Sequence, residues 1–422
     1  MTHAEDHGAT GHKSRSWILI GAVAAVGLPG FFLRVTGTHP DPVAGAFIFG
    51  FAVLAAAFLL SWAAETAEMD ISQGLALAVI AFIAILPEYA IDAVLAFRAG
   101  QDPEVAKEGL AIANMTGGNR LLIGLAWPIV FFIFFYRTKL RTLVVDRQRA
   151  LELVFLAIAT AYVILIPLRH GITLIDSMVL VSMFLCYLFF TSKQDSEEVE
   201  LVGPARVLGA LPSARRRTSV IVLLIFAAAV IFAAAEPFAE SLIHIGEDFG
   251  ISEFFLIQWL APLASEAPEV LVASLLAWRG RAAVGMGALI SSKVNQWTLL
   301  IGTLPIAYGF GSGDWSFTSG LPLNDLQREE IFLTAAQSAF AIAVFANLKM
   351  GMKEAIALFV LFATQLFITH ESIRVLYAGG YAVLCVALLI INRSELRPTI
   401  SSAWTILRGR KLPEHDEDPQ PA

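Results

Sequence analysis

Long apolar runs alternate with short polar segments along almost the whole chain. A membrane-spanning helix needs about 20 mostly apolar residues. Twelve runs of that kind are predicted, at residues 17–35, 43–64, 73–97, 108–135, 150–168, 172–191, 219–244, 252–278, 283–309, 330–348, 353–370 and 373–392. Two longer polar stretches, 192–217 and 311–328, interrupt the pattern. The chain is therefore predicted to be an all-α polytopic membrane protein.

Composition agrees with that prediction. Of the 422 residues, 57% are hydrophobic and only 15% are charged, with a mean hydropathy of +0.70, whereas soluble domains carry about 25% charge. Cys186 and Cys385 both lie inside apolar runs, which indicates neither a disulfide framework nor a metal cluster. The first run follows Lys13 and Arg15 without a convincing cleavage site, so an uncleaved first helix is expected.

Basic residues predict the orientation of the bundle. If the N-terminus is inside, 21 of the 29 Lys and Arg residues fall in inside segments and six fall outside. The positive-inside rule then places both termini in the cytoplasm, with the chain in a membrane of the prokaryotic cytoplasmic type. The remaining two basic residues, Arg120 and Lys293, lie within predicted spans.

Two segments 181 positions apart repeat one another. Residues 85–98 and 266–279 each hold a Pro-Glu pair inside an apolar run, with Glu88 and Glu269 as the acids. A carboxylate at bilayer depth costs several kcal/mol unless it is paired, hydrated or bound to a cation. Its appearance at matching points of two halves predicts a midplane ion site built by an internal repeat. The alternative is a chance likeness between hydrophobic sequences.

The repeat extends beyond these helices and sets the expected organisation. Residues 109–124 and 287–302 are each sixteen long and end in Leu-Ile-Gly. Five spans separate the starts of the two units, and an odd number inverts one unit relative to the other, as in many transporters. The expected parts are a polar tail (1–15), an extra first helix (16–42), repeat 1 (43–191), a cytoplasmic loop (192–218), repeat 2 (219–370), a last helix (371–393) and a polar tail (394–422).

These motifs resemble the sodium/calcium exchanger membrane region of the calcium:cation antiporter superfamily, of which the chain looks like a divergent bacterial-type member. The family pattern is Gly-Thr-Ser-x-Pro-Glu, followed by Gly-Ser-Asn-x-x-Asn/Asp in the next helix. The resemblance covers roughly residues 43–191 and 219–370, with Ser265 at the threonine position and Ser292 at the later serine. It implies two inverted five-helix repeats with a flanking helix at each end.

The chain also departs from the family pattern. Ala84 and Ile85 replace the Thr and Ser of repeat 1, and Glu266 replaces the Ser of repeat 2. Lys293 occupies the Asn place of the later motif, and Gln296 replaces its final acid. The choice among Ca²⁺, Na⁺ and H⁺ therefore stays open.

Glu88 and Glu269 are the predicted cation and proton ligands. Freed carbonyls near each proline would add hard oxygen ligands, which suit Ca²⁺, Na⁺ or H⁺, and a buried carboxylate can bind a proton in place of a metal ion. Such a site supports antiport, since only the loaded, neutralised site can cross. The alternative is a pair of packing glutamates hydrogen-bonded to their neighbours.

Further polar side chains lie on the facing helices. Those expected to contribute ligand oxygens or coupling are Asn114, Asn119, Ser265, Ser292, Asn295 and Gln296. Any one of them alone is more readily an interhelical hydrogen bond than a ligand, and only the motif positions of Ser292 and Asn119 place the two interpretations on an equal footing. Glu266 lies on the same helical face as Glu269 and is either an extra ligand or, as favoured here, the partner of Lys293.

The charged residues near the motifs have two interpretations each. Lys293 is hypothesised to be a built-in counter-ion that disfavours divalent cations, with snorkelling to an interface as the alternative, which is more plausible for Arg120. Asp92 extends the ion path or pairs with Arg98. Glu240, at a helix end, either lines an access channel or is simply solvated.

The leading hypothesis is a secondary active antiporter that exchanges Na⁺ or Ca²⁺ for H⁺, or Na⁺ for Ca²⁺, by alternating access. A non-transporting scaffold with a decayed site is a second hypothesis. An intramembrane enzyme is a third, and no His-Glu-x-x-His, nucleophile pair or phosphate loop supports it. No cofactor or nucleic acid is expected, and the expected partners are inorganic cations and membrane lipid.

Overall fold

The computed structural model describes residues 4–67, 69–70, 86–193, 201–318, 320–366, 371–394 and 396–408. The predicted run 73–97 lies partly outside these residues, and Ala84 and Ile85 lie wholly outside them. The α-helices are α1 (Ala4–Thr36), α2 (Pro42–Ala67), α4 (Leu86–Gln101), α5 (Pro103–Glu108), α6 (Leu110–Leu121), α7 (Trp127–Thr138), α8 (Ala150–Val163), α9 (Leu174–Thr191), α10 (Ala205–Gly209), α11 (Ser213–Phe249), α12 (Glu253–Trp278), α13 (Ala282–Asn295), α14 (Ile301–Ser312), α15 (Asp325–Phe345), α16 (Met352–Gln365), α17 (Glu371–Ile391) and α18 (Leu396–Leu407). Short 3₁₀ turns occupy Arg147–Arg149 and Ile166–Leu168.

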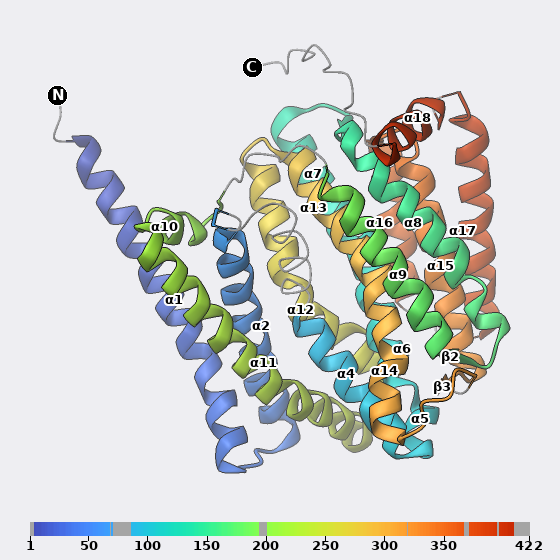
Figure 1. Ribbon diagram of the computed structural model, residues 1–422, viewed down its shortest axis with the longest axis horizontal. Coiled ribbons are helices and arrows are strands. Elements are labelled where there is room, and N and C mark those ends of the chain that lie inside the picture. The colour runs from blue at the N-terminus through green and yellow to red at the C-terminus, as the bar shows by residue number, and fades with distance from the viewer. Residues whose placement is uncertain are drawn as a thin grey trace.

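The fold is an all-α bundle, which confirms the predicted class (Figure 1). Eight helices in the described residues are long and apolar enough to cross a membrane: 14–36, 42–67, 103–138, 147–168, 174–191, 213–249, 253–278 and 372–391. Three more predicted runs coincide with α13–α14, α15 and α16. Of these, α16 has only 14 residues, and α15 carries buried Gln and Glu side chains that lower its hydropathy. The exact count of twelve spans therefore stays a prediction.

Helices α1, α2 and α11 form one side of the bundle (Figure 1). Long helix α11 packs along both α1 and α2, and α4 and α12 connect this group to the other helices. Helix α1 begins, and α18 lies, at the same end of the molecule (Figure 1).

Two small antiparallel strand pairs connect the halves. Strand β1 (Thr142–Val144) pairs with β4 (Lys349–Gly351), and β2 (Gly171–Thr173) pairs with β3 (Gly320–Pro322). Each pair therefore takes one strand from either side of the central polar stretch. Because β1 and β3 precede the fourth helix of their repeats, and β2 and β4 the fifth, each pair joins non-equivalent points. That cross-pairing is what an internal two-fold relation produces.

The third helix of each repeat has the same interruption. One π-helical turn, Leu122–Ala126, lies between α6 and α7, and another, Gln296–Leu300, lies between α13 and α14. Such turns are rare and frequently occur at functional sites. The shared interruption is the clearest local sign of the repeat.

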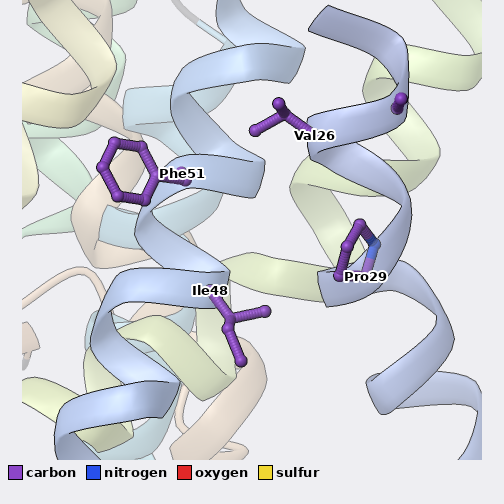
Figure 2. A pocket seen from close by; sticks show the side chains of 5 residues that line it. Val26, Pro29, Ile48 and Phe51 are labelled. Carbon is purple, nitrogen blue, oxygen red and sulfur yellow. The ribbon is translucent and has the colours of Figure 1, made fainter. Parts of the chain in front are cut away.

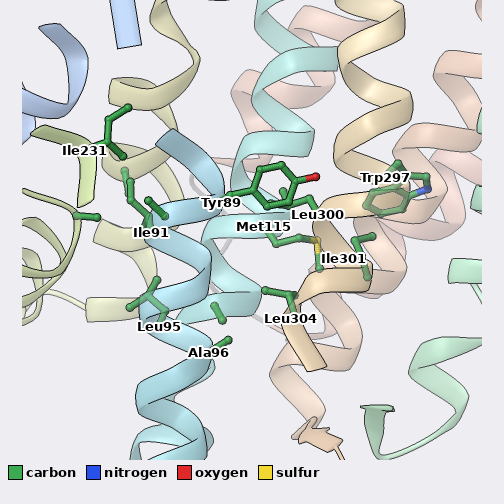
Figure 3. Packing of buried hydrophobic residues seen from close by; sticks show 14 of the residues in the cluster. Tyr89, Ile91, Leu95, Ala96, Met115, Ile231, Trp297, Leu300, Ile301 and Leu304 are labelled. Atoms are coloured by element: carbon green, nitrogen blue, oxygen red, sulfur yellow. The ribbon is translucent and has the colours of Figure 1, made fainter. Parts of the chain in front are cut away.

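Buried apolar side chains form two large clusters rather than one. One cluster includes Tyr89, Ile91, Met115, Leu300 and Ile301, drawn from α4, α6, the π-helical turn at Gln296–Leu300 and α14 (Figure 3). The other is centred on α7, α13, α15 and α17. Helices α12 and α13 contribute to both clusters, and α6 leads from the first cluster to the second through the π-helical turn that follows it. The polar residues of these three helices fall between the two clusters. The charged site thus lies where the hydrophobic core is divided.

Candidate functional site

The acidic helices α4 and α12 meet at the centre of the site. Glu88 and Glu266 are 1% and 3% exposed, and their carboxyl groups act on each other electrostatically. Ionised carboxylates cannot donate to one another, so among the described residues both Glu88 oxygens and Glu266 Oε2 lack a hydrogen-bond partner. A proton or a metal cation between them would relieve the repulsion.

Glu269 lies one helical turn beyond Glu266 along α12. It is partly exposed and faces the hydroxyl of Ser292. The structure thus places Glu266, rather than Glu269, opposite Glu88. The sequence repeat matches Glu88 to Glu269, but both α12 acids share one helical face, and only the packing decides which one is closer.

The helix α12 does not break at its prolines, in contrast to the predicted interruption. Pro262 and Pro268 both lie inside the continuous helix Glu253–Trp278. Each proline lacks an N–H and so removes a single helical hydrogen bond. The continuous helix packs closely against α6. A Cβ atom at Gly117 of α6 would lie 1.7 Å from the Gln258 carbonyl oxygen of α12.

Gly118 on α6 brings the backbone close to the central acid. A Cβ atom at this position would lie 2.5 Å from Glu88 Oε1, so only glycine leaves space for the carboxyl group in this arrangement. The adjacent residue, Asn119, is fully buried and donates from Nδ2 to the Met115 carbonyl at 2.8 Å.

Lys293 extends into the site from α13. Its side chain is fully buried, donates to Asn119 Oδ1, and holds its ammonium 4.0 Å from the centroid of the Trp297 ring. Glu88 and Glu266 are the carboxylates that act on its charge, yet among the described residues it makes no ion pair within 4.0 Å. Burial between two helices excludes snorkelling for Lys293.

The first partner of Glu266 is a neighbouring amide. Gln296 Nε2 donates to Glu266 Oε1, whereas Lys293 acts on Glu266 only as a nearby charge. The Gln296 Oε1 and Ser292 Oγ atoms have no partner in the described part of the chain. Unmatched carboxylate, amide and hydroxyl oxygens therefore surround the contact between the two glutamates.

Three predicted residues have other partners. Ser265 is positioned to donate to the carbonyls of Ala261 and Pro262, within its own helix, at 3.4 and 3.3 Å. Asn295 Oδ1 accepts from the Tyr89 hydroxyl at 3.0 Å. Asn114 Nδ2 donates to Asp92 Oδ1 at 2.8 Å. The alternative pairing of Asp92 with Arg98 does not occur, because Arg98 pairs with Glu240.

Arg120 belongs to a separate buried cluster. Its guanidinium is 2.5 Å from Glu330 on α15 and 5.1 Å from the centroid of the Trp259 ring. Both charged side chains are at most 5% exposed, which excludes snorkelling here as well. Gln258 completes the cluster by donating from Nε2 to Glu330 Oε2 at 3.0 Å.

Sequence reasoning missed Tyr89, Gln258 and Glu330. Tyr89 directly follows Glu88, so its adjacency was an available signal. Glu330 opens an apolar run without any motif, but the spacing that relates residues 109–124 to 287–302 matches it to Glu152, which was an available signal.

The described residues hold no group of three or more His, Cys, Asp or Glu side chains that converge as a metal cage. The central oxygens combine carboxylates with amides and a hydroxyl, which suits transient binding of a hard cation. An apolar pocket between α1 and α2, lined by Ala25, Val26, Pro29, Ile48 and Phe51, offers no such ligands (Figure 2).

Comparisons with known proteins support the fold and the repeat. A family model described as "Sodium/calcium exchanger protein" matches residues 42–193 and 219–370. The crystal structure of the H⁺/Ca²⁺ exchanger CAX is 40% identical, with a TM-score of 0.89, and the match covers 94% of this chain and 99% of that one. No curated protein matches the sequence.

Two more distant structures share the fold. Native YfkE is 16% identical with a TM-score of 0.60, over 87% of this chain and 100% of that one. The sodium-calcium exchanger NCX_Mj, soaked with Na⁺ and Sr²⁺, is 20% identical with a TM-score of 0.51, over 78% and 98%. These proteins are transporters and not enzymes. Since the family model covers both halves and the CAX match spans nearly the whole chain, this membrane protein belongs to the sodium/calcium exchanger family of cation antiporters.

Proposed function

We propose that this protein is a proton-coupled cation antiporter whose central site is formed by Glu88, Glu266 and Glu269. The observation that carries the proposal is the buried contact between Glu88 and Glu266, whose oxygens lack donors. Two facing carboxylates need a positive charge between them. A cation and one or more protons can supply that charge in turn, and alternation between them is the chemistry of antiport.

Ca²⁺ is the first candidate for the exchanged cation. The relative with 40% identity is named as an H⁺/Ca²⁺ exchanger, and Ca²⁺ prefers carboxylate and neutral oxygens of the kind found here. Glu88, Glu266, Glu269, Ser292 and Gln296 are the residues proposed to bind it. Because some of these oxygens are neutral, the site is also suited to releasing the Ca²⁺ ion after it has bound.

Na⁺/H⁺ exchange is the second candidate, and Lys293 favours it. The ammonium already contributes one positive charge next to Glu88 and Glu266. A fixed charge repels a divalent cation about twice as strongly as a monovalent one. If Lys293 replaces one of the exchanged charges, the exchanged cation is therefore expected to be monovalent.

Exposure along α12 fits an alternating-access cycle. Glu269 and Ser292 are partly exposed, whereas Glu88 and Glu266 are closed off from solvent. We infer that a cation enters past Glu269 and reaches the inner pair, and that the site reorients only when its charge is neutralised. Carboxylates without a bound cation or proton would stay charged inside the bilayer, and their reorientation would carry the full desolvation cost.

Transport assays in proteoliposomes test this function. Purified protein is reconstituted with a pH indicator inside the vesicles, and Ca²⁺, Na⁺ or K⁺ is added outside in separate runs. Addition of the exchanged cation should dissipate an imposed proton gradient. Glu88→Gln and Glu269→Gln should each reduce the signal to that of empty vesicles.

Glu104→Gln is the matched control, since Glu104 is exposed and pairs with the exposed Lys107. It should transport like the unmodified protein. An active Glu88→Gln/Glu269→Gln double variant would refute the proposed site. Absence of exchange with every cation would refute the function itself.

A further inference from the structure

Asp92, a buried acid near the site, is in contact with the side-chain amide of Asn114. Asp92, on α4, is 1% exposed, and Asn114, on α6, is fully buried. Asn114 Nδ2 donates to Asp92 Oδ1 at 2.8 Å. The other oxygen of each group, Asp92 Oδ2 and Asn114 Oδ1, is buried and has no partner among the described residues.

The two unpartnered oxygens are chemically informative. With Asp92 ionised, both are acceptors, so neither can satisfy the other and a buried charge stays unpaired. With Asp92 protonated, Oδ2–H can donate to Asn114 Oδ1. The acid and the amide would then be joined by two hydrogen bonds, and every polar atom of the contact would be satisfied.

The charged surroundings supply no counter-ion in the described residues. Glu88 and Tyr89, on the same helix, interact electrostatically with Asp92, and neither is a cation. The cations on Asp92's helix and on the helices packed against it lie with acidic partners elsewhere or at the surface: Arg98 with Glu240, Lys107 with Glu104, Arg120 with Glu330, Arg216 and Arg217 with Asp70, His244 with Glu247, and Arg215 exposed at the start of α11. The other titratable groups on these helices are Glu65, Glu104, Glu108, Glu236, Glu240, Glu247, Asp248, Glu253, Glu266, Glu269 and Tyr308.

We propose that Asp92 and Asn114 form a proton-binding site one helical turn from Glu88, loaded in this conformation and emptied when a cation binds at Glu88. On release, the O–H bond breaks, its electron pair stays on Asp92 Oδ2, and the proton passes to bulk water. The Asn114 N–H bond to Oδ1 is kept.

Coupling between the two positions follows from their spacing. Residues four apart lie on one helical face, and Glu88 and Asp92 already act on each other electrostatically. A cation at Glu88 attracts an ionised Asp92 and so favours loss of its proton. By reciprocity, the proton on Asp92 weakens cation binding by the same factor. This role in exchange rests on the proposed function, whereas the proton site itself does not.

Infrared spectroscopy of the purified protein tests the proton site directly. A protonated carboxyl group has a carbonyl band separate from that of a carboxylate. Asp92→Asn, which keeps the paired shape, should remove one such band, and Asn114→Leu should shift it because the acceptor is lost. Asp325→Asn, at a side chain that is 87% exposed, should leave it unchanged. A spectrum of Asp92→Asn identical to that of the unmodified protein would overturn the proposal.

Proton counting tests the coupling. Ca²⁺, and separately Na⁺, is added to weakly buffered protein with a pH indicator, and binding is followed by calorimetry. Asp92→Asn should release about one proton fewer per transporter for the same amount of bound cation. Equal release would overturn the coupling. If neither protein binds any cation, the proposed function fails, and the infrared band still decides whether Asp92 holds a proton.

Discussion

Arg120 and Lys293, the two buried cations among the described residues, lie in the third helix of repeat 1 and of repeat 2, yet their surroundings differ. Arg120 is matched by Glu330 at 2.5 Å, with Arg374 at 3.8 Å on the other side of that carboxylate. Lys293 is held by an amide and an aromatic ring, with two carboxylates nearby but none in contact in the described residues. A matched charge stabilises the packing of helices, whereas an incompletely matched one can respond to an ion.

The acids differ between the halves in a corresponding way. In repeat 1 the second acid, Asp92, follows Glu88 on α4, and in repeat 2 the second acid, Glu266, precedes Glu269 on α12. The two helices run in opposite directions (Figure 1). The four carboxyl groups therefore form a ladder, with Asp92 at one end, Glu88 and Glu266 in the middle, and Glu269 at the other end. Inversion of the repeat thus brings two offset pairs of acids together along the two helices.

The largest effect should come from breaking the matched pair. Arg120→Met leaves Glu330 buried next to its more distant partner, and loss of one member of a buried pair costs about 3–5 kcal/mol. We expect a clear fall in the thermal unfolding temperature of the detergent-solubilised protein. The corresponding change Lys293→Met should have a smaller effect, because no contacting carboxylate is left behind.

A double variant separates the charge from the packing. In Arg120→Met/Glu330→Leu both charges are absent, and apolar replacement of a buried pair is often neutral or stabilising. Stability should therefore return most of the way to that of the unmodified protein. If the double variant is as unstable as the single one, Arg120 acts through its packing on Trp259 rather than through its charge.

Changing Lys293 should alter ion preference more than stability. Lys293→Asn restores the family residue and removes a positive charge beside Glu88 and Glu266, so Ca²⁺ affinity should rise at least about tenfold, equivalent to about 1.4 kcal/mol. Na⁺ affinity should change less, since its charge is half as large. Calorimetric titration with each ion measures both. Lys353→Asn, at an exposed lysine, is the control, and an unchanged Ca²⁺:Na⁺ preference would contradict the counter-ion hypothesis.

Sequence patterns identified the fold because bilayer length and repeat symmetry both leave traces in the order of residues. The exchanger resemblance is confirmed by the family match, and Glu88, Asn119, Lys293 and Gln296 do come together in the structure. Which of Glu266 and Glu269 faces Glu88 could not be predicted, since both occupy one face of α12. The partner of Arg120 was equally hidden, because Glu330 is 210 positions away and lies in no recognised motif. Pairings between distant helices depend on packing that the local pattern does not contain.

The smallest effect should appear at an ion pair nearer solvent, whose acid, Asp70, lies outside the spanning helices. Arg216 donates to both oxygens of Asp70, at 2.6 and 2.8 Å, and Arg217 to one at 3.0 Å. The hydrogen bond from Arg216, aided by Arg217, lowers the pKa of Asp70 from 3.8 to about 2.

Because the pKa is lower in the folded state, the pair stabilises fully above pH 3.8, and this contribution is lost as the pH falls through about 2. Asp70→Asn should thus lower stability at neutral pH, but by less than loss of the Arg120–Glu330 pair, because the Asp70 pair is less buried and its charge is better screened by solvent. Unfolding temperatures of the two proteins, measured at a series of pH values, should converge in acid. A difference that persists unchanged at low pH would mean that Asp70 acts through neutral hydrogen bonds. The matched charge nearer solvent would then contribute far less to stability than the one between Arg120 and Glu330.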